Sequence, residues 1–226
     1  MTDRQTSEHH TFSQGLWGNN PALIQLLGLC PLLAVSHYAI TAITLGVISL
    51  TVMIAANGLI SLLRPLMSEL IRLPLQIMVI ASLVSIADLL LQAFYFELHE
   101  RIGLFVALIV TNCAILGRAE LMARRSPIRH ALLDGLSMGL GFFWVMCVMG
   151  MLREVLGRGT LFAEAGRLTG FPLPDHGIQL LETPLQIMVF APGAFFTLAF
   201  LIAGKNYLDQ RNESRQADRI SQQTSS

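Results

Sequence analysis

The chain has 226 residues, of which 53% are hydrophobic and only 13% are charged, and its mean hydropathy is +0.58. A soluble domain carries roughly 25% charged residues, so this chain has too few to cover a water-exposed surface, and membrane lipid is predicted to surround it. Fifteen basic residues balance fifteen acidic ones. With no basic tract and no aromatic-basic interleaving, nothing in the sequence indicates nucleic acid as a partner.

The N-terminal part combines a polar leader, residues 1–20, with a short apolar segment. No small-residue cleavage site follows a basic lead, so no signal peptide is predicted. Asn20 before Pro21 is a helix-start signal. The first apolar segment, residues 21 to about 36, reaches about 24 Å as a helix, which is less than the roughly 30 Å of membrane hydrocarbon. Pro31 directly follows Cys30, so the sequence predicts a broken or half-length helix there.

The next three segments are two long ones followed by a short one. The second, Tyr38 to about Leu63, and the third, residues 71 to about 98, are long enough to span a membrane, and the third contains Asp88. The fourth, residues 102 to 117, again reaches only about 24 Å as a helix. Its later part carries Cys113.

The last two segments complete the apolar part of the chain. The fifth, residues 131–156, is expected to approach another helix closely at its glycines, Gly135, Gly139, Gly141 and Gly150. A loop over residues 157–182 follows. The sixth segment, residues 183–203, is interrupted at Ala191-Pro192-Gly193. The polar tail, residues 205–226, is expected to be disordered, without regular structure, at its Ser/Gln-rich end.

An internal repeat divides the chain into two halves. The hexapeptide Pro-Leu-Gln-Ile-Met-Val occupies residues 74–79 and again residues 184–189, each time at the start of the third segment of a set of three. The halves are residues 21–98 and 99–204. Because each holds an odd number of segments, the second enters the membrane from the opposite side. The predicted fold is an all-α integral membrane protein with six transmembrane segments in two inverted three-segment repeats, each beginning with a short or broken helix.

The basic residues indicate the orientation. If all six segments cross, eleven of the fifteen lie on one side, which places both termini in the cytoplasm by the positive-inside rule. Those eleven are Arg4, Arg64, Arg72, Arg118, Arg124, Arg125, Arg129, Lys205, Arg211, Arg215 and Arg219. Two charged pairs, Arg118 with Glu120 and Arg153 with Glu154, are interpreted as interface anchors at segment ends.

The three cysteines carry the functional prediction. An odd count in apolar segments argues against a disulfide framework. Cys30 and Cys113 lie in the short first segments of the two halves, where inverted repeats place a site near the membrane midplane. Cys147 has no counterpart and is interpreted as a core residue. A zinc or iron–sulfur site needs four soft ligands, and neither His37 nor His99 lies at an equivalent position, so a second subunit is expected to supply two further cysteines.

Four other polar residues are candidates for roles inside the membrane. Asp88 is a candidate for an ion path, because an intramembrane carboxylate is a functional hypothesis by default. Gln76 and Gln186 are repeat-equivalent and are candidates for the same path or for hydrogen bonds between helices. Asn112, next to Cys113, is either a donor to a cluster sulfur or a helix cap.

Several stretches resemble a known family. They are Gly15–Pro21 with its Trp17, Gln25–Val35, Ile109–Cys113, Gly117–Glu120, Asp134–Gly141, Arg153–Phe162 and Ala191–Phe195. These residues resemble the NqrD/RnfE family, which comprises the E subunit of the Rnf (Rsx) complex and the D subunit of the sodium-translocating NADH:quinone reductase. The tryptophan-containing lead and the Cys30-Pro31 step favour the Rnf member, and the quinone reductase member is the close alternative.

The resemblance implies a non-autonomous subunit of a translocase in the bacterial inner membrane. That complex moves electrons between ferredoxin and NAD and couples them to Na⁺ or H⁺ transport. The subunit pairs with a homologous six-span subunit of opposite topology, and the two share a [2Fe–2S] cluster. The matching ligands in this chain are Cys30 and Cys113. Flavin, NAD and the other clusters belong to other subunits, which agrees with the absence of a Rossmann glycine pattern and of CxxC here.

Two hypotheses without redox chemistry remain. One is a secondary transporter whose inverted repeats bind a solute or ion. The other is a scaffold subunit with no chemistry of its own. Both predict that serine or alanine is tolerated at Cys30 and Cys113, whereas the redox hypothesis predicts that it is not.

Overall fold

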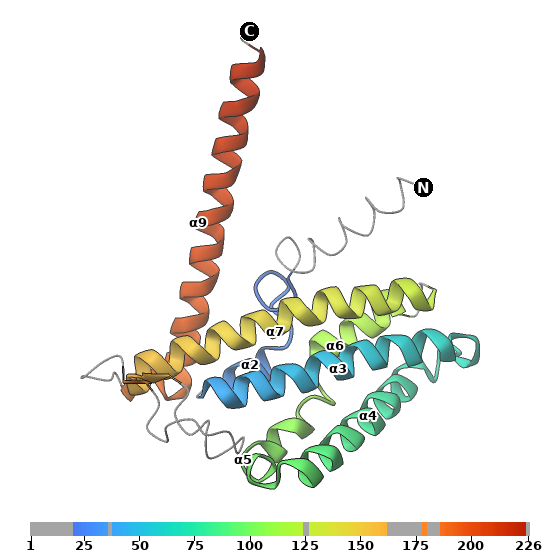
Figure 1. The fold of residues 1–226 in the computed structure, drawn as a ribbon. Helices are drawn as coiled ribbons and strands as arrows, with labels where there is room; N and C mark the ends of the chain where they lie inside the picture. The colour runs from blue at the N-terminus through green and yellow to red at the C-terminus, as the bar shows by residue number, and fades with distance from the viewer. Residues whose placement is uncertain (1–19, 36–37, 124–126, 162–177, 180–185, 225–226) are drawn as a thin grey trace.

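The computed structural model describes residues 20–35, 38–123, 127–161, 178–179 and 186–224 (Figure 1). The leader 1–19, His37 and most of the 157–182 loop lie outside this part of the chain. The described helices are α2 (Leu29–Val35), α3 (Ala39–Leu63), α4 (Arg72–Phe94), α5 (Phe96–Ala107), α6 (Cys113–Arg118), α7 (Ile128–Arg158) and α9 (Ala191–Thr224). Shorter elements are the 3₁₀ turns η2 (Arg64–Leu66) and η4 (Gln186–Met188), the π-helical turn η3 (Ala119–Ala123), and the antiparallel strands β1 (Thr160–Leu161) and β2 (Ile178–Gln179).

Three described helices are long and apolar enough to cross a membrane, namely α3, α4 and α7. The prediction of a helical membrane protein is therefore confirmed, and α3 matches the predicted second segment almost residue for residue. The predicted irregular end of the tail is wrong, because α9 continues to Thr224 and projects away from the other helices (Figure 1). No glycine or proline occurs between Lys205 and Thr224 to stop the helix, and Lys205 Nζ lies 2.6 Å from Asp209 Oδ2 one turn later.

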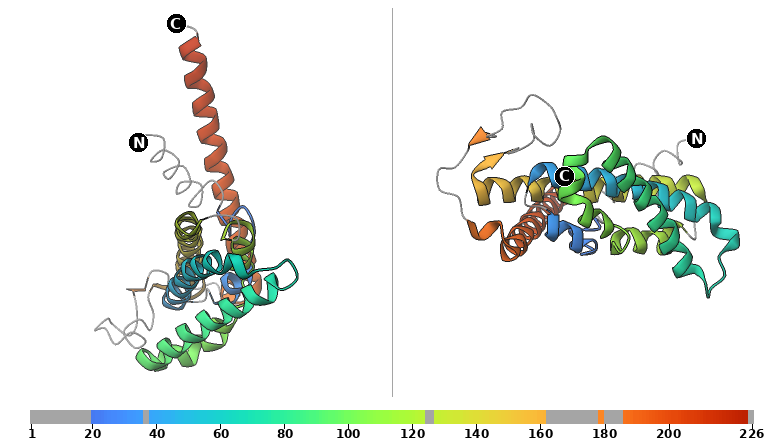
Figure 2. Two further views of the ribbon diagram at one scale, coloured as in Figure 1. Left: turned by 90° about the vertical axis from the view of Figure 1, so that its right-hand side faces the viewer. Right: turned by 90° about the horizontal axis from the view of Figure 1, so that it is seen from below.

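The centre of the fold is the antiparallel pair α3 and α7, which lie side by side in both views of Figure 2. Small residues allow this contact. A Cβ added to Gly150 would lie 3.3 Å from Ala39 Cα, and one added to Gly135 would lie 3.3 Å from Ile54 Cα. Since Gly150 meets the start of α3 and Gly135 its later part, the two helices run in opposite directions along their length. The predicted close approach at these glycines is confirmed.

The third and fourth predicted segments divide differently from the expectation. Instead of continuing to residue 98, α4 ends at Phe94, and α5 begins two residues later. The predicted segment 102–117 consists of the end of α5, a non-helical stretch at residues 108–112, and the six-residue α6. One face of α5 is buried through Leu98, Ile102 and Val106, so this helix is amphipathic rather than uniformly apolar.

The interruption in the first segment lies before Cys30 and not after it. Pro31 is the third residue of α2, and the first turn of a helix tolerates proline because its N–H groups have no intrahelical acceptor. The chain turns earlier, at Leu26 (φ 53°) and Gly28 (φ 77°), which are both in the left-handed region. This segment is therefore a turn followed by a seven-residue helix.

The two copies of the repeated hexapeptide have different conformations. Residues 74–79 lie inside the first turns of α4. In the second copy, Gln186–Met188 form the 3₁₀ turn η4, and α9 starts after it at Ala191. Gly193 explains the difference, because its N–H bonds back to the Phe190 carbonyl at 3.0 Å and a Cβ there would overlap Met188 Cα. The predicted interruption near residues 191–193 is observed directly before α9.

Candidate metal centre

Cys113 is the first residue of α6, and Asn112 caps that helix. The Asn112 Oδ1 accepts a hydrogen bond from Ala114 N at 3.0 Å, and the Asn112 side chain is only 1% exposed. Of the two roles predicted for Asn112, capping is therefore present in the structure. Cys113 is exposed, so a second subunit can reach it.

The segment that leads to Cys30 packs directly against Cys113. The Gly28 N–H donates to Cys113 Sγ at 2.9 Å. A Cβ on Gly28 would lie 2.7 Å from Phe142 Cε2 and 3.1 Å from Asn112 Oδ1, so only glycine allows this approach. Cys30 follows Gly28 by two residues, which limits the distance between their Cα atoms to about 7.6 Å. The structure thus brings the predicted pair into one region.

The exposure of the three cysteines separates the same pair from the third that their positions in the sequence separated. Cys30 and Cys113 are exposed, whereas Cys147 is buried in α7. No group of three or more Cys, His, Asp or Glu side chains gathers into a metal site within the described part of the chain. Two exposed cysteines in a membrane protein therefore form at most half of a four-ligand site.

Asn20 holds the start of the first segment. Its Oδ1 accepts from Ala22 N at 3.0 Å, and its Nδ2 donates to the Gly141 carbonyl on α7 at 3.0 Å. The side chain is fully buried. The predicted helix start at Asn20-Pro21 is instead a turn, and α2 begins only at Leu29.

A buried arginine on α7 holds the far end of α2. The Arg153 guanidinium donates to the Leu33 carbonyl at the end of α2 and to three carbonyls ahead of α9, with distances from 2.8 to 3.3 Å; these three belong to Met188, Val189 and Phe190. Arg153 and its neighbour Glu154 are both 0% exposed, and Glu154 Oε2 accepts from Ala39 N, the first residue of α3, at 2.7 Å. Their interpretation as interface anchors is therefore wrong.

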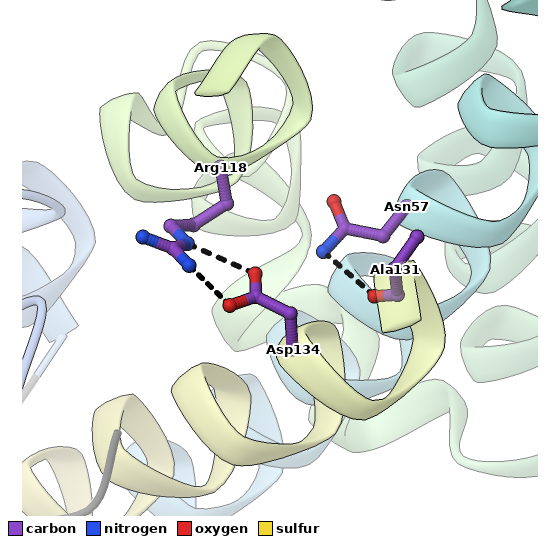
Figure 3. A network of polar contacts seen from close by, with 4 residues as sticks. All are labelled: Asn57, Arg118, Ala131 and Asp134. Carbon is purple, nitrogen blue, oxygen red and sulfur yellow. Dashed lines mark hydrogen bonds and ion pairs between the residues drawn. The ribbon is translucent and has the colours of Figure 1, made fainter. Parts of the chain in front are cut away.

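The far end of α6 is held by a buried ion pair with α7 (Figure 3). Arg118 Nε donates to Asp134 Oδ2 at 3.0 Å, and Arg118 Nη2 donates to the other carboxylate oxygen. The exposed fractions of Arg118 and Asp134 are 7% and 2%, so Arg118 is not an interface anchor either. Beside this pair, Asn57 Nδ2 donates to the Ala131 carbonyl at 3.4 Å and connects α3 to the start of α7.

The turn η3, directly after α6, contacts the start of α4. Glu120 lies 3.0 Å from Gln76 Nε2 and 3.1 Å from Arg72 Nη1. Gln76 is fully buried, so the structure shows the hydrogen bond between helices that the sequence analysis offered as one of its two roles. The side chain of Gln186, its repeat equivalent, lies outside the described residues.

Asp88 lies next to a histidine of the following helix. His99 Nε2 lies 3.1 Å from Asp88 Oδ1 across the corner between α4 and α5. Both side chains are partly exposed.

The sequence predicted Cys30 and Cys113 as ligands, but it did not single out the residues that contact their segments. Gly28, Arg153 and Asp134 lie in stretches that resemble the family, but their contacts could not be predicted because their partners are distant in sequence. A glycine two residues before a cysteine in a short apolar segment is the one signal that was available for Gly28.

Comparisons with known proteins agree with the resemblance noted from the sequence. The profile of the Rnf-Nqr subunit family of membrane proteins matches residues 9–202. The E subunit of the ion-translocating oxidoreductase complex of Pseudoalteromonas atlantica is 47% identical over 202 residues, which cover 88% of this chain and 87% of the relative. The same subunit of Pasteurella multocida is 43% identical over 205 residues, covering 90% and 92%. The profile match includes both short helices and the interruption before α9.

Proposed function

The chain belongs to the Rnf-Nqr family of membrane subunits, and on that premise we propose that it is the E subunit of an ion-translocating oxidoreductase complex. In this proposal, Cys30 and Cys113 provide two of the four ligands of a [2Fe–2S] cluster, and a homologous subunit provides the other two. The relatives that match along almost the whole chain are named as E subunits, which favours this assignment over the D subunit of the sodium-translocating quinone reductase.

The observation that carries the proposal is the contact between the two cysteine segments. The Gly28 N–H meets Cys113 Sγ at 2.9 Å, and Cys30 follows two residues later. Thiolates are the ligands of iron–sulfur clusters, and N–H donors to their sulfur atoms are a regular part of such sites. Because both thiols are exposed, a partner subunit has access to both. The residues present therefore fit half of a shared cluster.

Each residue around the cysteines has a positioning task in this proposal. Asn112 fixes the start of α6, Gly28 allows the two segments to approach, and Arg153 and Asp134 hold the far ends of the two short helices. When bound, the cluster supplies one-electron transfer in the interior of the membrane. The protein supplies a fixed geometry for the two thiolates.

We extend the proposal to the six-span inverted repeat with both termini in the cytoplasm of a bacterial inner membrane. The antiparallel packing of α3 and α7, the second segments of the two halves, supports it. So do two crossed contacts. Gln76 in the first half contacts Glu120 beyond α6, and the carbonyls of residues 188–190 in the second half share Arg153 with the end of α2. Such reciprocal contacts are what inverted repeats produce.

Electron flow between ferredoxin and NAD, coupled to Na⁺ or H⁺ transport, is the activity proposed for the whole complex. Other subunits carry the flavins and the further clusters. Within the ion-path part of the proposal, Gln76 binds Glu120 and Asp88 binds His99, so any ion that used them would have to displace these partners.

The test uses the purified complex with Cys30→Ser, Cys113→Ser and, as a matched control, Cys147→Ser. We expect each of the first two variants to lose iron and one [2Fe–2S] signal in the low-temperature EPR spectrum of the dithionite-reduced complex. The buried Cys147 variant should retain both. If iron and signal persist in all three variants, the redox role is wrong, and the transporter and scaffold hypotheses take its place.

A further inference from the structure

Asn112 has a side-chain group that no contact in the described chain explains. Its Oδ1 caps Ala114, but its Nδ2 has no hydrogen-bond partner among the described residues, although the side chain is 1% exposed. A buried amide without a hydrogen-bond partner destabilises the folded state, so such a group needs an explanation. The residue bonded to Asn112 is Cys113, one of the two proposed ligands.

Asn20 provides an internal comparison. Both asparagines are buried, and both accept a hydrogen bond from the N–H two residues later at 3.0 Å. The difference lies in the amide nitrogen. Asn20 Nδ2 donates to the Gly141 carbonyl, whereas Asn112 Nδ2 has no acceptor within the described part of the chain. Capping alone therefore does not account for an asparagine at position 112, because serine or aspartate would cap as well.

The region around Cys113 already holds a donor to sulfur. Gly28 N–H donates to Cys113 Sγ at 2.9 Å. A one-electron reduction increases the negative charge on the sulfur atoms of a cluster, so N–H donors next to them stabilise the reduced form and raise the reduction potential.

We propose that the Asn112 side-chain amide is a hydrogen-bond donor to the sulfur atoms of the cluster at Cys113 and, together with the Gly28 N–H, raises the reduction potential there. This inference rests on the proposed function. Asn112 is a positioning residue for α6 through its oxygen and a tuning residue through its nitrogen. The residue directly before Cys30 is Leu29, whose side chain has no donor, so the tuning acts through the Cys113 side of the site.

The experiment is a potentiometric titration, on the purified complex, of the EPR signal that Cys113→Ser removes. Asn112→Ser keeps a capping oxygen but removes the amide. At the wild-type midpoint potential we expect a fall of about tenfold in the reduced-to-oxidised ratio, which is about 59 mV for a one-electron couple. The matched control is Asn20→Ser, which removes an amide that already has an acceptor within the protein and should leave the midpoint unchanged.

The remaining outcomes each decide the question. If the Asn112→Ser complex does not keep the cluster, the Asn112→Asp complex is titrated instead, because aspartate has the size of asparagine and also caps a helix. The Asn112→Asp variant should lower the midpoint potential as well. If neither variant keeps the signal, the wild-type complex labelled with [γ-¹⁵N]asparagine must show a weakly coupled ¹⁵N in pulsed EPR. An unchanged midpoint in a variant that keeps the signal, or no ¹⁵N coupling, overturns the inference. A signal that survives Cys113→Ser instead overturns the proposed function.

Discussion

The segments that precede Cys30 and Cys113 both lead into a short helix, but they start that helix by different means. Each leads into a helix of six or seven residues. The first turns through left-handed backbone at Leu26 and Gly28, whereas the second ends in the Asn112 cap. One approach thus uses backbone freedom and the other a side-chain acceptor. Both halves contain the cysteine, but the residues before it differ. A left-handed turn starts the short helix in the first half, and an asparagine cap starts it in the second.

The far ends of the two short helices differ as well. At the end of α2, Arg153 donates to backbone carbonyls that the interruptions leave without helical partners. At the end of α6, Arg118 pairs with a carboxylate, Asp134. The first arrangement stabilises an irregular backbone, and the second neutralises a buried charge. The following substitutions test these differences, from the largest expected effect to the smallest.

Arg153→Met should have the largest effect. It removes the donor to four carbonyl groups, of which that of Phe190 keeps another donor, the Gly193 N–H. A hydrogen bond to a charged group contributes roughly 1.5–3 kcal/mol, so the loss of the other three should lower the free energy of unfolding by more than about 4 kcal/mol. Thermal unfolding in detergent measures the loss. Arg158→Met is the control, because Arg158 is exposed and lies 3.9 Å from the centroid of the Tyr38 ring, an interaction of about 0.5–1 kcal/mol. Equal losses in the two variants would contradict the role given to Arg153.

Asp134→Asn should follow, with a loss of about 3–5 kcal/mol, because it leaves the Arg118 charge buried and uncompensated. The double variant Arg118→Met/Asp134→Leu should recover most of that loss, since replacing both partners with apolar groups removes the uncompensated charge. The same unfolding assay compares the single and double variants. A double variant as unstable as the single one would show that the pair has a role beyond mutual neutralisation.

Gly28→Ala should cost about 1–3 kcal/mol, because alanine at φ 77° is strained and its Cβ would lie 2.7 Å from Phe142 Cε2. Gly117→Ala in α6 is the control. Its Cβ would meet nothing closer than Leu27 Cδ1 at 3.6 Å, and alanine is the better helix former, so stability should be unchanged or higher. The cluster signal should weaken only in the Gly28 variant. Loss of the signal in the Gly117 variant alone would mean that the approach to Cys30 is not the sensitive one.

The smallest expected effect is the difference in stability loss between Asn112→Ala and Asn20→Ala. Asn112→Ala loses a cap worth about 1 kcal/mol. Asn20→Ala loses a cap and also the bond to the Gly141 carbonyl, so its destabilisation should exceed that of Asn112→Ala by about 1 kcal/mol. Chemical or thermal unfolding of both variants provides the comparison. A larger loss at Asn112 would indicate that its Nδ2 contributes to stability through a partner even without the cluster.

Much of the fold followed from patterns that the sequence contains locally. The apolar run of α3 and the glycines of α7 were sufficient to predict two long helices and a close helix contact for the second, although not that α3 would be its partner. The cysteine pair could be predicted as a site because matching position in two halves is itself a sequence pattern. Local patterns failed where a distant partner decides the structure. Arg153, next to Glu154 and near a segment end, has the sequence of an interface anchor, but its acceptors lie at Leu33 and at residues 188–190.

The repeated hexapeptide shows a second limit. Residues 74–79 and 184–189 are identical, yet the first copy continues into a long helix and Gln186–Met188 form a 3₁₀ turn. The residues that follow each copy determine its conformation. Ile80-Ala81 continue the helix of the first copy, whereas Pro192-Gly193 favour the start of a new helix after the second. The position of the first break was missed for a related reason. Pro31 is the more conspicuous breaker, but within the first turn of α2 it is compatible with the helix, and Gly28 takes the strained conformation.

The measurement that tests the central claim most directly is the proximity of Cys30 and Cys113 within one chain. In membranes that contain the full chain with Cys147→Ser and no bound iron, dibromobimane should join the two remaining thiols and become fluorescent, and peptide mapping should locate the link between them. Removing either cysteine should abolish the fluorescence. If both thiols react singly and no link forms, the two short helices do not present their cysteines to a common site, and the shared-cluster proposal is wrong.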